Sequence, residues 1–184
     1  MTFELPTSLE VAGQEYEIYT DYRDVLNIIA AFEDPNLEPA EKQYICLHNL
    51  FKNDEKIPQE HYAEAYKAAI TFIDNGIEPD QGSPRTMDWE QDAPVLFPAV
   101  NHVAGFEVRS VDYLHWWTFT GFFMEIKESV YATVLSIRSK KAKGKKLEKW
   151  EKDFWQANKK LCVLKEKLTE EEQAEKDRLN AILG

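Results

Sequence analysis

Three carboxylates close to a tryptophan come nearest, in this sequence, to a pattern suited to acid–base chemistry. They are Asp88, Glu90 and Asp92, which surround Trp89 in the stretch DWEQDA. Two carboxylates in different surroundings can act as a general acid and a general base. Acidic residues also stabilise the first turn of a helix, by capping it and by interacting with its dipole. The role in a first helical turn accounts for the three carboxylates without any catalytic function, and we prefer this explanation.

The histidines and cysteines could in principle bind a metal or act as nucleophiles. The two cysteines, Cys46 and Cys162, lie far apart and form no C-x-x-C motif. Motifs for phosphate loops, serine hydrolases and zinc proteases are absent from the sequence. We therefore predict a protein that is not an enzyme, with no metal, no cofactor and reduced cysteines. The four histidines have no companion at ligand spacing: His48, His61, His102 and His115.

The aromatic stretch VDYLHWWTFTGFFMEI, residues 111–126, is apolar on nearly every side. This pattern is typical of a helix that is surrounded by protein. Its large side chains could instead line a groove that captures a peptide, but aromatic residues at helical spacing more often form a core. We predict that this helix is the centre of the core. The large side chains are Tyr113, Trp116, Trp117, Phe119, Phe122, Phe123 and Met124.

The strongest charge feature is the basic segment SIRSKKAKGKKLEKW, residues 136–150, which holds seven cations and one anion. Such a segment could bind a phosphate backbone. Removing its charge of +6 from the chain's total of −11 leaves −17 elsewhere, a field that repels nucleic acid. We therefore favour an exposed basic loop between two helices and keep nucleic-acid binding as the alternative. The cations are Arg138, Lys140, Lys141, Lys143, Lys145, Lys146 and Lys149.

The N-terminal third of the sequence predicts a hairpin followed by three helices. Residues 8–19 alternate between apolar and polar on both sides of a glycine turn, which is typical of a β-hairpin. From Asp21 the apolar residues recur at helical spacing until Pro35 ends the helix. Pro39 and Pro58 each open a further helix, because proline is favoured in a first helical turn.

The middle of the sequence begins with GIEPDQGSPR, residues 76–85, whose glycines and prolines predict a surface loop. Asp88 can cap a helix that Gly105 ends. Pro94 and Pro98 imply that this helix starts late or is kinked. Another helix follows the aromatic one and leads into the basic segment.

The last predicted helix has apolar residues at strict 3-4 spacing from Leu147 to Leu168. A stripe this narrow can pack along a groove or another helix, so we predict that it binds a helical partner. The alternative is that its two aromatic residues close the domain's own core. After it, Thr169 and Glu172 form a capping box for a charged helix. The predicted partner-binding residues are Trp150, Phe154, Leu161, Leu164 and Leu168.

These patterns predict a mainly α fold: a helical domain with a small N-terminal β-hairpin and a long C-terminal amphipathic helix. We expect a single domain over residues 1–168 and a charged helical tail over residues 169–184. The first residues resemble no signal peptide. The longest uncharged aromatic run, residues 116–124, is too short to span a membrane, which takes about 20 residues.

Four stretches together resemble the siphophage gene-product-fifteen family of phages and prophages of low-GC Gram-positive bacteria. The similarity covers about Leu5 to Leu164. It rests on LPTSLEVAGQEYEIYTDYRDVL, DWEQDA, YLHWWTFTGFF and SIRSKKAKGKKLEKWEKDFW.

The resemblance implies a tail assembly chaperone, which binds the tape measure protein before the tail tube polymerises and has no catalytic residues. It implies action in the host bacterial cytoplasm and absence from the mature virion. Some relatives in other phages also occur in a longer, frameshifted form. We therefore expect the tape measure protein as partner, together with another copy of the chain or such a longer form, and neither a membrane nor nucleic acid.

Overall fold

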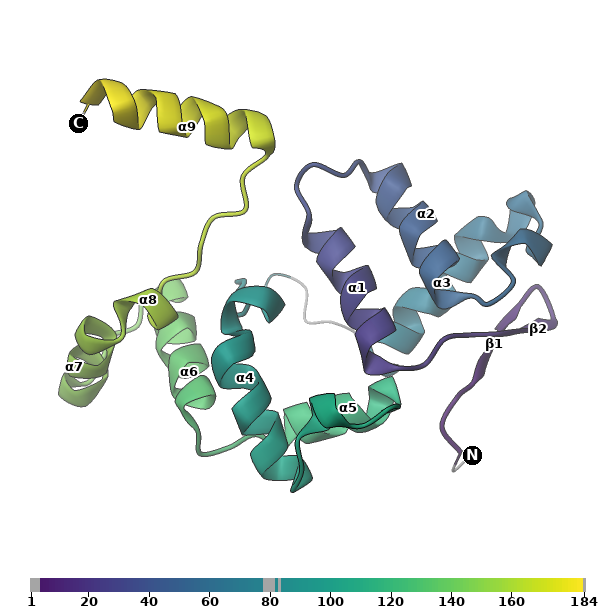
Figure 1. Ribbon diagram of the computed structural model, residues 1–184, viewed down its shortest axis with the longest axis horizontal. Coiled ribbons are helices and arrows are strands. Elements are labelled where there is room, and N and C mark those ends of the chain that lie inside the picture. Colours follow the sequence, from purple (N-terminus) through teal and green to yellow (C-terminus); the bar gives the residue numbers. More distant parts are fainter. Residues whose placement is uncertain (1–3, 78–81, 83, 184) are drawn as a thin grey trace.

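The computed structural model describes residues 4–77, 82 and 84–183. Within them the chain is mainly helical, with an antiparallel hairpin near its N-terminus and a long helix, α9 (Glu170–Leu183), at its C-terminus (Figure 1). This confirms the predicted fold class. Part of the predicted surface loop, residues 78–81 and 83, lies outside the described residues.

The hairpin consists of strands β1 (Ser8–Val11) and β2 (Gln14–Glu17), with Leu9 opposite Tyr16. A two-residue turn joins them, and Gly13 in that turn has a φ of 78°. Tight hairpin turns need such left-handed angles, which glycine adopts without a steric penalty. The predicted hairpin is therefore confirmed.

Three helices follow, as predicted. The carboxylate of Asp21 caps the first by accepting a hydrogen bond from the backbone N–H of Arg23. Pro39 is the first residue of the second helix. Two short 3-10 turns, Asp54–Lys56 and Gln59–His61, precede the third helix, which starts four residues after Pro58. The helices are α1 (Tyr22–Glu33), α2 (Pro39–Leu50) and α3 (Tyr62–Ile73).

Asp88 caps the fourth helix as predicted, and Gly105 ends it in a left-handed conformation. Pro94 and Pro98 lie inside this helix, so the late start that they suggested is wrong. A 3-10 turn, Val108–Ser110, leads to the aromatic helix. The helices of this part are α4 (Trp89–Ala104), α5 (Trp116–Met124) and α6 (Val130–Ala142).

Helix α5 joins the two sides of the core, because it packs against both α1 and α4. Phe119 is fully buried and stacks on Tyr22 of α1, with ring centroids 4.5 Å apart. The indole N–H of Trp116 donates to the carbonyl of Ile73 over 2.9 Å. His115 is buried, and its ring nitrogens bond to the carbonyl of Pro6 and the backbone N–H of the second residue of α5. The aromatic helix is thus the predicted centre of the core.

The predicted continuous helix from Leu147 to Leu168 is wrong. The structure has α7 (Lys149–Ala157) and the single turn α8 (Lys159–Cys162), with Asn158 between them in a non-helical conformation. Residues 163–169 are not helical and lead to α9, which lies apart from the other helices in the view of Figure 1.

The start of α9 follows the sequence prediction. The hydroxyl of Thr169 accepts a hydrogen bond from the N–H of Glu172 over 3.1 Å, and the Glu172 carboxylate accepts one from the N–H of Thr169 over 2.9 Å. This is the reciprocal capping box. None of the described helices is both long enough and apolar enough to cross a bilayer.

Candidate functional site

A buried ion pair between α4 and α6 is the centre of the polar network in the C-terminal half. The carboxylate of Asp92 accepts two hydrogen bonds, of 2.7 and 2.8 Å, from the guanidinium of Arg138. The side chains are only 2 and 4% exposed. Asp92 therefore does more than stabilise a first helical turn. The prediction that Arg138 belongs to an exposed basic loop is wrong.

Arg138 also holds backbone carbonyls on two other segments. Its guanidinium donates to the carbonyls of Thr86, before α4, and of Cys162 and Leu161, in α8. With the two bonds to Asp92, all five guanidinium N–H groups have an acceptor. The single turn α8 is thereby fixed against α4 and α6.

Asp88 connects the start of α4 to the segment that follows α8. Its carboxylate accepts a hydrogen bond of 2.7 Å from the N–H of Gln91 and pairs with Lys167 at 3.2 Å and with Arg85. Burial opposes ionisation of this carboxyl. The Gln91 N–H and Lys167 outweigh that effect, so the pKa of Asp88 lies below its usual value.

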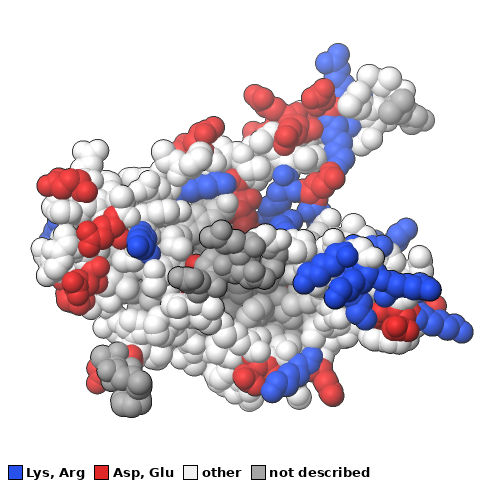
Figure 2. Space-filling model, turned by 180° about the vertical axis from the view of Figure 1, so that it is seen from behind, with Lys and Arg blue, Asp and Glu red and all other residues white. Residues whose placement is uncertain are grey.

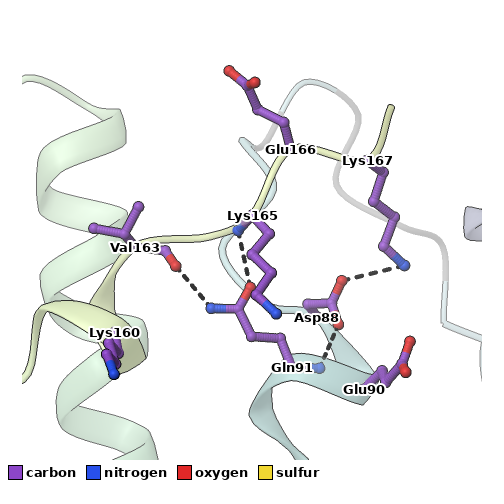
Figure 3. A pocket seen from close by; sticks show the side chains of 8 residues that line it. All are labelled: Asp88, Glu90, Gln91, Lys160, Val163, Lys165, Glu166 and Lys167. Atoms are coloured by element: carbon purple, nitrogen blue, oxygen red, sulfur yellow. Dashed lines mark hydrogen bonds and ion pairs between the residues drawn. The ribbon is translucent and has the colours of Figure 1, made fainter. Parts of the chain in front are cut away.

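The side chain of Gln91 pairs with the extended segment after α8 in the manner of a strand (Figure 3). Its amide N–H donates to the carbonyl of Val163 over 2.7 Å, and its amide oxygen accepts from the N–H of Lys165 over 2.9 Å. We call residues 163–168 the clamped segment. A groove of about 870 Å³ lies along it. The groove is lined by Asp88, Glu90, Gln91, Lys160, Val163, Lys165, Glu166 and Lys167.

This arrangement explains why the long helix is interrupted. The carbonyls of Leu161, Cys162 and Val163 accept hydrogen bonds from Arg138 and Gln91. In a continuous helix they would accept from the N–H groups four residues further on. Side chains from α4 and α6 thus replace the helical bonds of this stretch. The groove in Figure 3 lies where the clamped segment attaches to α4, and the ion pair between Lys167 and Asp88 helps to hold that segment.

The structure does not bring the five predicted partner-binding residues onto one helix face. Trp150 is 58% exposed on α7, which rules out that it closes the core. Phe154 lies half-buried on the same helix, and Leu161 lies half-buried in α8. Leu164 and Leu168 are half-buried in the clamped segment.

The basic segment is exposed in part. Arg138, Lys140 and Lys141 belong to α6, so the connection between helices comprises only residues 143–148. Lys140 pairs with the buried carboxylate of Glu151 over 2.6 Å. That hydrogen bond, with one from the N–H of Glu148, lowers the pKa of Glu151.

Six other lysines around the end of α6 and the start of α7 are exposed, and we call them the basic ridge. Figure 2 shows lysine and arginine side chains gathered on this part of the surface. The ammonium group of Lys141 lies 4.0 Å from the centre of the Trp155 ring, a cation–π contact. The ridge consists of Lys141, Lys143, Lys145, Lys146, Lys149 and Lys152.

An apolar groove of about 510 Å³ lies between α1, α3 and α5. The aromatic stretch therefore forms both core and groove: Trp116 contributes to both, and Met124 is 54% exposed at the groove's edge. Sequence patterns did not identify the contributions of α1 and α3, since half-buried positions share the apolar spacing of core positions. The apolar lining residues are Ile29, Phe32, Ile70, Ile73, Ile77, Trp89, Trp116, Phe123 and Met124.

Among the described residues, no three histidine, cysteine, aspartate or glutamate side chains lie close enough together to hold a metal ion. Cys46 and Cys162 are free and buried. Burial raises the pKa of the Cys46 thiol to about 12 and also raises the pKa of Cys162. Neither thiol is therefore activated as a nucleophile.

Comparison with protein-family models matches residues 1–164 to the family described as Bacteriophage Gp15 protein. Comparisons with curated proteins and with solved structures find no match. The match contains the polar network around Arg138 and the apolar groove, and it ends inside the clamped segment. Helix α9 lies outside it.

Proposed function

The chain belongs to the Bacteriophage Gp15 protein family, a family of phage structural and assembly proteins, and we propose that it is a tail assembly chaperone of a siphophage. In this role it binds the tape measure protein before the tail tube polymerises, without catalysing a reaction. It acts in the cytoplasm of a Gram-positive host and is absent from the mature virion.

The apolar groove between α1, α3 and α5 is the observation that carries the proposal. Ile77 and Met124 at its edge are 56 and 54% exposed, which leaves apolar surface available to a partner. Residues of α1, α3 and α5, together with Trp89 of α4, form its walls, so an amphipathic helix can place its apolar side chains between them. Long helical partners such as the tape measure protein present such faces before they assemble. A binder that covers them prevents premature association.

Polar groups at the groove fit a reversible complex. Asp74, Asn75 and Thr120 line it beside the apolar residues. The hydroxyl of Thr120 donates to the side-chain oxygen of Asn75 over 3.0 Å. Burial raises the pKa of Asp74, because an apolar environment disfavours its ionised form. A partner would thus meet a mainly apolar surface with a few polar groups set among the apolar side chains.

Co-expression with the tape measure protein of the same phage tests the proposal. The variant Ile77→Asp with Met124→Asp places two charges at the groove's edge, where both side chains are exposed. We expect the variant to unfold at the same temperature as the wild type and to lose co-purification, because binding would bury unpaired charges. Val130→Asp is the matched control: Val130 is 50% exposed at the first position of α6, away from the groove, and should leave binding intact.

Two further variants separate binding from folding and locate the surface. Val25→Asp puts a charge at a fully buried position and should unfold the protein. Leu161→Asp with Leu164→Asp tests the residues that the sequence favoured. If this pair alone abolishes co-purification while the protein stays folded, the partner binds at α8 and the clamped segment. If the wild type fails to co-purify with the tape measure protein at all, the chaperone proposal is wrong.

The basic ridge supports nucleic-acid binding as a second candidate function. Its six lysines and Trp150, next to Lys149 on α7, are all exposed, and cations with an aromatic ring suit single-stranded nucleic acid. Arg138 and Lys140 contribute less than the sequence suggested, since both are paired with carboxylates. A gel shift at physiological salt decides: selective binding tighter than about 1 µM, the limit of typical non-specific association, would favour this function.

A further inference from the structure

The basic ridge is a surface whose charge the described part of this protein does not neutralise. None of its six lysines forms an ion pair with another described residue, whereas the neighbouring Lys140 does. The exposed connection 143–148 carries three of them. Trp150 follows Lys149 on α7 and adds exposed apolar surface. This combination suits an acidic partner that also presents apolar side chains.

Helix α9 has the complementary character. It contains five carboxylates and two cations, a net charge of −3, and every residue from Glu170 to Ile182 is exposed. Glu171, Glu175, Leu179 and Ile182 recur at spacings of four, four and three residues and therefore share one helix face. Leu179 is 51% exposed and Ile182 is 70% exposed. One face of α9 thus combines carboxylates in its first half with apolar side chains in its second.

The beginning of α9 is fixed to its own chain at a distance from the ridge. The N–H of Glu170 donates to the side-chain oxygen of Asn36 over 2.8 Å, next to α1. Lys167 pairs with Glu33 over 2.5 Å, and Lys176 pairs with Glu166 over 2.8 Å. Folding α9 back onto the chain's own ridge would require these contacts to break. In Figure 2 the projecting part that contains α9 carries both acidic and basic side chains and lies apart from the basic ridge.

We propose that α9 of one copy of this protein docks on the basic ridge of a second copy. The carboxylates of the shared face meet the ridge lysines, and Leu179 and Ile182 cover Trp150. If each copy donates its α9 to the other, the contact closes as a symmetric dimer. The proposal is independent of tape measure binding, because it involves neither the apolar groove nor another protein. It uses a helix that lies outside the family match.

Sedimentation velocity of the purified, nuclease-treated protein measures the association directly. We expect a dimer whose dissociation constant rises as salt is raised from about 0.01 M to about 1 M, since the Debye length then falls from about 30 Å to about 3 Å. A wild type that stays monomeric at low salt contradicts the proposal. In that case the basic ridge would bind a different acidic partner, and the gel shift would show whether that partner is nucleic acid.

A pair of charge-reversal variants identifies the two surfaces. The ridge variant carries Lys143→Glu, Lys146→Glu and Lys149→Glu, and the helix variant carries Glu171→Lys and Glu175→Lys. Each alone presents like charges to a second copy, so dimerisation should weaken by about tenfold or more. Mixed together they are complementary in both directions, and a heterodimer should form.

The mixture shows whether α9 and the ridge meet between two copies or within one chain. Mixing the two variants can restore a contact between copies, but it cannot restore a contact within one chain. A mixture that remains monomeric, or a single variant that dimerises as the wild type does, overturns the proposal. Glu55→Lys with Glu60→Lys changes the net charge as much as the helix variant does, at exposed positions outside α9, and should dimerise normally. Circular dichroism of the helix variant checks that α9 stays helical.

Discussion

The carboxylate of Asp92 accepts hydrogen bonds from donors in two parts of the chain. It accepts two hydrogen bonds from Arg138, 46 residues away, and one of 3.0 Å from the N–H of Asp88. The capping roles of Asp88 and of Thr169 with Glu172 could be predicted, because a cap depends on residues within one turn. The pair between Asp92 and Arg138 could not, since it exists only after α4 and α6 have packed together.

Removing Asp92 should be costly because it leaves a buried guanidinium without its counter-charge. We expect Asp92→Ala to lower the free energy of unfolding by about 3–5 kcal/mol, the range for breaking one side of a buried pair. Urea denaturation followed by tryptophan fluorescence provides the measurement. Asp153→Ala, at an exposed site on α7, should change stability by no more than about 0.5 kcal/mol. A loss no larger than that in the Asp92 variant would show that water compensates Arg138.

At the scale of elements, the helices that agree with the sequence are those whose start and end signals are local. Pro39 and Gly105 correctly predicted the start of α2 and the end of α4, and helical spacing correctly predicted α1. The stripe from Leu147 to Leu168 satisfied the same spacing rule, yet its helix is interrupted at Asn158 and ends at Cys162. Side chains from α4 and α6 take its backbone hydrogen bonds, and no pattern within the stripe could reveal those competitors.

Gln91 should control the attachment of the clamped segment. In Gln91→Ala we expect the segment to detach and the neighbouring thiol of Cys162 to react faster with iodoacetamide, since its burial is lost. Cys46, which is fully buried in the other half, should remain protected. Mass spectrometry after a brief labelling pulse distinguishes the two thiols.

Gln156→Ala, at an exposed position of α7, provides a matched control for the labelling. It should leave both cysteines as slow as in the wild type. Equal acceleration of Cys46 and Cys162 in the Gln91 variant would indicate general unfolding. Continued protection of Cys162 would show that Arg138 is sufficient to hold the segment.

At the scale of the whole molecule, α5 determines how the N-terminal and C-terminal helices fit together. Its position in the core was predictable from its composition, because a helix that is apolar on all sides has to be surrounded by protein. The three walls of the apolar groove were not predictable, because they require α1, α3 and α5 to be placed in space. The sequence thus indicated the fold class and the core but not the surface that we propose for the partner.

A substitution of Phe119 tests whether α5 joins the N-terminal and C-terminal helices into one folding unit. Its ring is fully buried between the helices, and Phe119→Ala should cost about 3–5 kcal/mol through the cavity that it leaves. Differential scanning calorimetry should show a lower melting temperature with a single transition, since both halves depend on the same ring. Tyr44→Ala, at a 63% exposed position of α2, should change stability by about 0.5 kcal/mol or less. Two separate transitions in the Phe119 variant would mean that the halves fold independently.

The saturated guanidinium of Arg138 also limits how this chain can evolve. Lysine has three donors on one nitrogen and cannot reach, from a single point, the acceptors that Arg138 serves on Asp92, Thr86, Leu161 and Cys162. The ridge lysines have no such geometry to maintain, so lysine and arginine can replace one another there with little effect. The seven cations of the basic segment look alike in the sequence. Selection should nevertheless preserve arginine at position 138, because a lysine there could not serve all of these acceptors.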